Sequence, residues 1–170
     1  YYTDTIFPCL TPLAFDPGRP FPHISNLSLN LAVVLRDTAG KNHFARLKVP
    51  QQLPQLIAVP AASTRRKSHP VQRFVWIEQA IAANLGSLFP GLKLVESHPF
   101  HVTRDAEVAI KELESDDLLE TVEEAVWRRR FHKPVRLLTD AGISEEILDI
   151  LVENLDVGPD DVLRVPGPLD

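Results

Sequence analysis

Apolar and polar residues alternate in several short stretches of the chain, and this alternation predicts β-strands. The segments 29–36 and 43–49 are separated by a polar turn that contains Gly40, which predicts a β-hairpin. The second strand of this hairpin is expected to place alternate side chains on opposite faces, Ala45, Leu47 and Val49 on one and Phe44, Arg46 and Lys48 on the other.

Further short strands are predicted along the rest of the chain, at 56–59, 73–76, 93–96, 100–103, 135–139 and 162–165. Pro99 is expected to divide 93–96 from 100–103. The segment 63–70 is polar and predicts a flexible loop within the longer stretch from Ala61 to Val71, to which no role is assigned.

Apolar residues recur at helical spacing in three other segments. The first is 77–89, ended by Pro90 and Gly91, and the second is 117–130, where acidic residues begin the helix and arginines end it. The third follows Ser144, a typical N-cap residue. Together these elements predict an α+β fold in which about three helices pack on a mixed β-sheet.

The N-terminal arm, residues 1–26, is rich in proline yet also carries large apolar side chains. Its five prolines fall within about fifteen residues and exclude a helix there: Pro8, Pro12, Pro17, Pro20 and Pro22. The apolar residues exclude a disordered linker, so the arm is predicted to be irregular, rigid and packed against the fold. The other end of the chain, residues 164–170, has the turn-forming composition of a linker to a further domain.

Composition describes an ordinary globular domain of 170 residues, 44% apolar and 24% charged. The net charge of −5 argues against a general nucleic-acid binder. A single cysteine excludes an intrachain disulfide and suits a reducing compartment, and no segment is apolar over a membrane-spanning length. These features predict a cytosolic protein of one domain. The lack of an initiator methionine and the linker composition of residues 164–170 predict that this domain is cut from a longer chain.

Candidate chemistry is sparse. The pair His98 and His101 is not expected to bind a metal, because three-residue spacing on a strand directs the side chains to opposite faces. The basic run from Arg65 to Lys67 is interpreted as a solvated loop. Arg128, Arg129 and Arg130 could bind phosphate oxygens, although their position at a helix end already accounts for them.

Four blocks of sequence, in order, resemble the middle or "head" domain of bacterial type 1 polyphosphate kinases. The arm matches the family's IFPxLTPLAxDPxxPFPxISNLSLNLAV run, and the segment 78–91 matches ExxIAxNLxxLFPG. The segment 98–105 matches HPFRVTRD, with His101 in place of the commoner arginine, and 116–131 is similar to DDLLExxExxLRRRRFG. The residues 165–170 resemble the junction to the next domain.

The resemblance implies a four-domain, cytoplasmic enzyme, able to associate with the membrane, that transfers the terminal phosphate of ATP to polyphosphate through a phosphohistidine and with Mg²⁺. It assigns this chemistry to two phospholipase-D-like domains that follow and to a small helical domain that precedes. The chain itself is therefore expected to hold no catalytic residue, metal or cofactor. Its expected role is scaffolding of the phosphate-chain tunnel and association of subunits into a homo-oligomer.

If this domain contacts polyphosphate, the expected residues are Arg104, held in orientation by Asp105, and the cluster of Arg128, Arg129 and Arg130. A structural pairing of Arg104 with an acid is an equal alternative. Two other functional classes stay open: a stand-alone phosphate-binding module, and a small enzyme similar to phosphohistidine phosphatases.

Overall fold

The computed structural model describes residues 1–15, 20–60, 72–105 and 133–169, which divide into two compact units. The first unit contains Tyr1–Pro22 and Asn30–Pro99, and the second contains His23–Leu29 and Phe100–Asp170. The predicted helix at 117–130 and the predicted loop at 63–70 lie outside the described residues.

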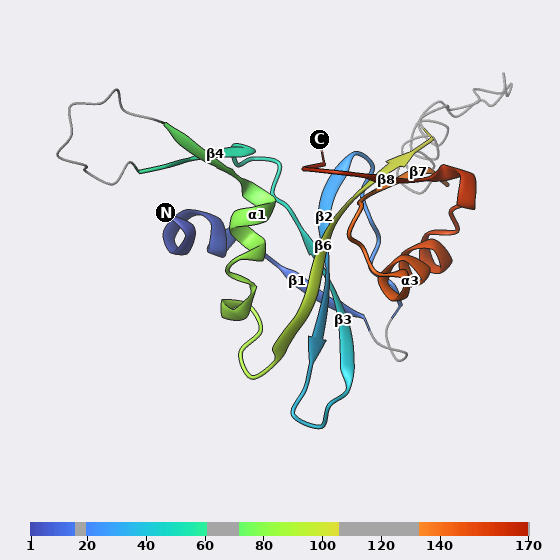
Figure 1. The fold of residues 1–170 in the computed structure, drawn as a ribbon, viewed down its shortest axis with the longest axis horizontal. Helices are drawn as coiled ribbons and strands as arrows, with labels where there is room; N and C mark the ends of the chain where they lie inside the picture. The colour runs from blue at the N-terminus through green and yellow to red at the C-terminus, as the bar shows by residue number, and fades with distance from the viewer. Residues whose placement is uncertain (16–19, 61–71, 106–132, 170) are drawn as a thin grey trace, which may run out of the picture. The chain divides into compact units, whose positions relative to one another are not determined.

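The first unit is built on the predicted hairpin, formed by β2 (Ser28–Arg36) and β3 (Asn42–Lys48). Figure 1 shows the two strands joined by a tight turn, where Gly40 has a φ of +85°. Asn30 pairs with Lys48 and Arg36 with Asn42, which confirms the hairpin. Both faces of the hairpin are buried, with Leu47 on one face of β3 and Phe44 on the other, so the hairpin lies in the core.

The N-terminal arm begins with one turn of π-helix, η1 (Tyr2–Ile6), and one turn of 3₁₀-helix, η2 (Phe7–Cys9). It then adds an edge strand that the sequence analysis did not predict, β1 (Pro12–Phe15), antiparallel to β3. Pro12 is tolerated because it is the first residue of an edge strand. The arm is packed as expected, since Ile6 and Leu10 are buried and Phe21 contacts the rings of Phe15 and Phe44.

A separate two-stranded sheet pairs β4 (Leu56–Val59) with β5 (Arg73–Trp76) and leads directly into α1 (Ile77–Ala82). The helix predicted over 77–89 is therefore wrong in length, because the chain leaves α-helical geometry at Asn84 and ends in a 3₁₀ turn, η3 (Leu85–Ser87). The side chain of Asn84 donates to the carbonyl of Ala80, and its own carbonyl accepts from Ser87. These local bonds, with the low helix propensity of Asn84 and Gly86, end the helix early.

Strand β6 (Lys93–Arg104) runs through both units without interruption, so the prediction that Pro99 divides two strands is wrong. The registered pairs between β6 and β7 (Pro134–Asp140) begin at Phe100. Pro99 lies one residue before them, so its missing N–H removes no hydrogen bond from that ladder.

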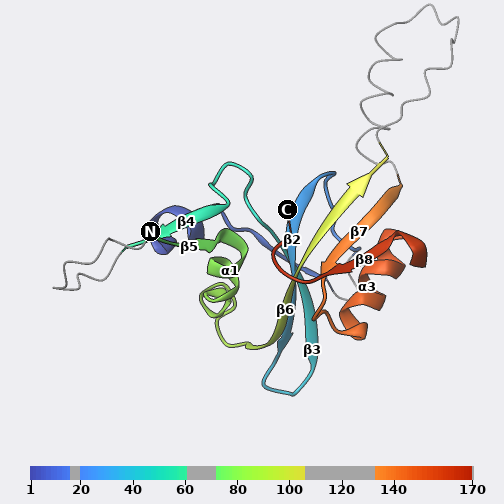
Figure 2. The ribbon, with the colours of Figure 1, turned by 45° about the horizontal axis from the view of Figure 1, so that its top comes forward.

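The second unit also contains α3 (Glu145–Leu155), a 3₁₀ turn, η4 (Pro159–Asp161), and β8 (Val162–Val165), which is parallel to β7. Figure 2 shows α3 beside β7 and β8, where Arg164 of β8 donates to both carboxylate oxygens of Glu145 at 2.7 and 2.8 Å. Ser144 caps α3 as predicted, with its Oγ accepting from the N–H of Ile147 at 3.3 Å.

The strands outside the β4–β5 pair form one six-stranded sheet with the order β1-β3-β2-β6-β7-β8. The β7–β8 pair is parallel, whereas β1–β3, β2–β3 and β6–β7 are antiparallel. The predicted α+β class with a mixed sheet is therefore confirmed. Within the described residues, no helix is long and apolar enough to cross a membrane.

Candidate functional site

Arg104, the described member of the predicted phosphate-contact set, ends β6 and is only 9% exposed. Its backbone N–H donates to Oδ1 of Asn26 at 2.7 Å, and its side-chain Nε donates to the carbonyl of Ile24 at 2.9 Å. Both bonds lie inside the second unit and join positions about 80 residues apart in the sequence. Arg104 thus holds the segment from Ile24 to Asn26 against the end of β6.

The partner segment is shaped to receive Arg104 by its own polar residues. Ser28 Oγ donates to the carbonyl of Ser25 at 2.6 Å, and the N–H of Leu27 donates to the carbonyl of Val102 at 2.9 Å. Leu27 has a φ of +52°, a conformation that branched side chains rarely adopt. The kink at Leu27 directly follows Asn26, whose side-chain amide accepts from the backbone of β6.

Burial lowers the pKa of the Arg104 guanidinium, because desolvation disfavours its charged form. Two bonds of Arg104 join it to a backbone carbonyl and an asparagine side chain, and the alternative of a pairing with an acid stays a prediction. Asp105, expected to orient Arg104, bonds through its backbone N–H to the carbonyl of Lys133 at 3.2 Å. A phosphate contact at Arg104 stays a prediction, and Arg128, Arg129 and Arg130 lie outside the described residues.

His98 and His101 both lie on β6. Nε2 of His98 is 3.1 Å from Oε2 of Glu96 on the same strand. Among the residues that the structure describes, no three His, Cys, Asp or Glu side chains gather closely enough to hold a metal ion.

A second site was missed by the sequence analysis, a cavity of about 270 Å³ in the first unit. Arg46 and Lys48 of β3 line it together with residues that include Cys9, Thr11 and Leu13. Arg46 is only 6% exposed, and its Nε donates to Oδ1 of Asn30 at 2.8 Å. The signal in the sequence was an arginine between apolar residues of a predicted strand. Alternation alone assigns this arginine to the outer face of the strand.

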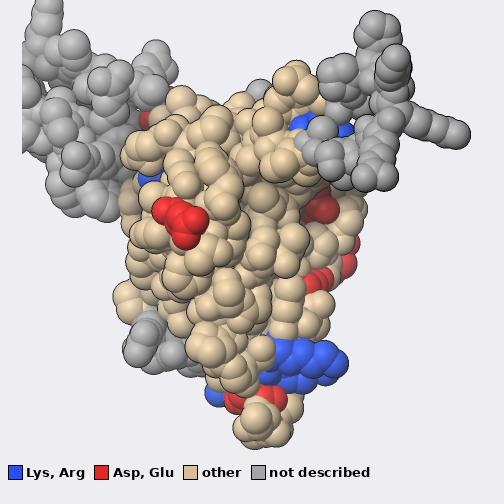
Figure 3. All heavy atoms as spheres, turned by 90° about the vertical axis from the view of Figure 1, so that its left-hand side faces the viewer, with Lys and Arg blue, Asp and Glu red and all other residues tan. Residues whose placement is uncertain are grey.

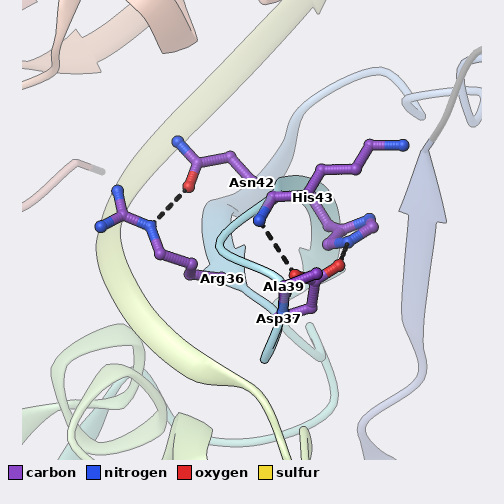
Figure 4. Close-up of polar contacts among 6 residues, drawn as sticks. Arg36, Asp37, Ala39, Asn42 and His43 are labelled. Carbon is purple, nitrogen blue, oxygen red and sulfur yellow. Dashed lines mark hydrogen bonds and ion pairs between the residues drawn. The ribbon is translucent and has the colours of Figure 1, made fainter.

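The β2–β3 turn carries the other well-defined polar cluster (Figure 4). Oδ1 of Asp37 accepts from the N–H groups of Ala39 and Lys41, both at 2.9 Å, and its Oδ2 is 2.8 Å from Nε2 of His43. The hydrogen bond to His43, followed by that from Lys41, lowers the pKa of Asp37 below 3.8. This cluster fixes the turn geometry.

Charged side chains on the face drawn in Figure 3 stand in separate small groups within a surface made mostly of other residues. The pattern agrees with the negative net charge of the chain.

Comparison with known proteins gives one consistent family. The model of the polyphosphate kinase middle domain matches residues 1–170. The polyphosphate kinase of Mycobacterium avium strain 104 is 47% identical over 173 residues, which cover 100% of this chain and 24% of that protein. The polyphosphate kinase of Mycolicibacterium gilvum strain PYR-GCK is 46% identical over 171 residues, 100% of this chain and 23% of that protein.

Among solved structures, the crystal structure of polyphosphate kinase from Porphyromonas gingivalis is similar, with a TM-score of 0.74 and 23% identity. The match covers 99% of this chain and 22% of that one, and at this identity it shows the fold alone. The chain thus spans about a quarter of the length of the relatives that it matches.

Proposed function

The chain belongs to the polyphosphate kinase middle-domain family, and from this premise we propose that it is one domain of an enzyme that transfers the terminal phosphate of ATP to polyphosphate. The observation that carries the proposal is the family match over residues 1–170, together with relatives about four times longer. In such an enzyme ATP and Mg²⁺ act at the neighbouring domains, in the cytoplasm. The single cysteine of the chain supports that location.

Within the enzyme we assign this domain to subunit association and to support of the phosphate-chain tunnel. The β4–β5 sheet supports an association role, because Leu56 and Phe74 are 47% and 53% exposed. Leu56 pairs with Trp76 and Ala58 with Phe74, which places these four side chains on one face of the ribbon. A two-stranded ribbon is marginally stable in water, so an apolar partner surface would stabilise it.

The association role is tested by sedimentation velocity on the 170-residue chain and on Phe74→Ser. We expect the parent chain to self-associate and the variant to do so at least about tenfold more weakly, which corresponds to about 1.4 kcal/mol. Leu163→Ser is a matched control, because Leu163 is a similarly exposed residue (46%) on β8. A strictly monomeric parent chain, or equal loss in both variants, would contradict the assignment to this ribbon.

The non-catalytic role is tested by incubating the chain with labelled ATP, Mg²⁺ and a polyphosphate primer. We expect neither labelled polyphosphate nor labelled protein, because phosphoryl transfer needs several cations converging on the phosphates. Elongation of the primer, or an acid-labile phosphoprotein, would instead favour the alternative of a small enzyme with its own phosphate chemistry.

A further inference from the structure

We propose that the cavity around Arg46 is a binding site for a small oxoanion of the phosphate class, such as inorganic phosphate or pyrophosphate. The proposal concerns the first unit alone and holds whether or not the domain mediates subunit association. It rests on three observations: the strand register that gathers the lining residues, the unpaired charge of Arg46, and the size and donor set of the cavity.

The register of β1, β3 and β2 brings the lining side chains to one face of the sheet. Leu13 of β1 and Ala32 of β2 both lie directly opposite Arg46 of β3. Asn30 lies opposite Lys48, two positions from Ala32, so the bond from Arg46 to Asn30 runs diagonally across the hairpin. Arg46 and Lys48 are two residues apart on one strand and therefore share this face.

Among the residues that the structure describes, the guanidinium of Arg46 has no acidic partner. Its Nε bonds to the neutral amide of Asn30, whereas its buried Nη2 has no hydrogen-bond partner in the described structure. None of the described residues that line the cavity is acidic. Buried charges in proteins are normally paired, because desolvation of an isolated ion is costly. Burial accordingly lowers the pKa of Arg46, and a bound anion would supply the missing charge.

The size and the donor groups of the cavity suit a small anion. Its volume of about 270 Å³ lies just below the roughly 300–1,000 Å³ of sites for drug-sized ligands, so it suits an anion of few atoms rather than a nucleotide. Thr11 and Gln51 add a hydroxyl and an amide to the two cationic side chains. The planar guanidinium of Arg46 can bind phosphate through two parallel bonds, and Lys48 adds a second cationic side chain to the lining.

The only cysteine of the chain provides a reporter, because Cys9 is exposed and lines this cavity. Iodoacetate is an anion and iodoacetamide is neutral, so the ratio of their alkylation rates at Cys9 measures the local positive potential. Any change in the exposure or ionisation of the thiol affects both reagents and cancels in the ratio. At constant ionic strength, we expect phosphate to lower the ratio of the iodoacetate rate to the iodoacetamide rate by about threefold or more. This effect should saturate, with half-saturation at about 1 mM phosphate.

Arg46→Gln, which retains an amide that can donate to Asn30, should lower the ratio without phosphate and remove the phosphate response. Titration calorimetry with pyrophosphate should show binding to the parent chain and none to Arg46→Gln. Arg36→Gln is the matched control, because Nε of Arg36 likewise donates to an asparagine, Asn42, at 3.0 Å, but from an exposed position outside the cavity (Figure 4). This control should behave as the parent chain does.

If circular dichroism shows that Arg46→Gln is unfolded, Lys48→Gln is the second variant, because Lys48 is only half-buried. It should weaken the effect of phosphate on the alkylation ratio by about threefold or more. A phosphate response that does not saturate, or that persists in the cavity variants, overturns the proposal. If acetate lowers the alkylation ratio as much as phosphate does, the proposal is also wrong, because the cavity would then bind carboxylates, such as one from another protein segment, as well as phosphate.

Discussion

The bond between Asn26 and Arg104 offers a direct test of how the second unit is held together. Asn26→Ala removes the Oδ1 atom that accepts from the N–H of Arg104 at 2.7 Å, the shorter of the two bonds that Arg104 makes to this segment. Arg104 is 9% exposed, so water can replace the lost acceptor only in part. Loss of a bond to a largely buried donor costs about 1–3 kcal/mol, and we expect about 2 kcal/mol here.

Two measurements check this value. With an m-value of roughly 2 kcal/mol per M, the urea midpoint of Asn26→Ala should fall by about 1 M. Amide hydrogen exchange at Arg104 should become about 30-fold faster, the factor equivalent to 2 kcal/mol, if the N–H exchanges by local opening.

Asn26→Asp is the matched control, because a carboxylate oxygen can accept the same bond and lies near a guanidinium. We expect its stability to stay within about 0.5 kcal/mol of the parent chain. If Asn26→Ala also stays within that range and the exchange of the Arg104 amide is unchanged, the reasoning about this bond is wrong.

Three further changes have expected outcomes. Ser144→Ala removes the cap of α3 and should lower the free energy of unfolding by about 1 kcal/mol in urea titration, with Ser144→Asp restoring it; an unchanged midpoint would refute the cap. Gly40→Ala meets no atom within 4 Å of the added Cβ but imposes a φ of +85° on alanine, so the melting temperature should fall by an amount equivalent to about 1 kcal/mol; a rise would contradict this. Because the pKa of Asp37 is lowered in the folded state, its stabilising contribution is complete above the ordinary value of 3.8 and is lost as the pH falls through the lowered pKa. The parent chain should therefore lose stability relative to Asp37→Asn only below about pH 4, and parallel acid titrations of the two proteins would exclude this role.

The local elements of the fold were largely predictable from the sequence, because their signals are local. The β2–β3 hairpin follows from alternation and a glycine-containing turn, and α3 follows from Ser144 and a repeated apolar stripe. The family resemblance, carried by motifs spread over the chain, was confirmed by the match over residues 1–170.

The missed features depend on partners far away in the sequence. β1 became a strand because β3, more than 25 residues later, offered a free edge, and Pro99 was tolerated because the ladder to β7 begins beyond it. Alternation placed Arg46 with Phe44 and Lys48 correctly but could not show that this face is covered too. The two faces of β3 look different in sequence, yet Ala45 and Arg46 are both buried.

The second unit is built from two segments that are far apart in the sequence, so one segment is synthesised well before the other. Ile24, fully buried in the native fold, leaves the ribosome 80 residues before Arg104, which bonds to its carbonyl. At about 5–20 residues per second this delay lasts about 4–16 s. For that interval the carbonyl of Ile24 lacks its native donor, and the part of the second unit that begins at Phe100 has not been completed.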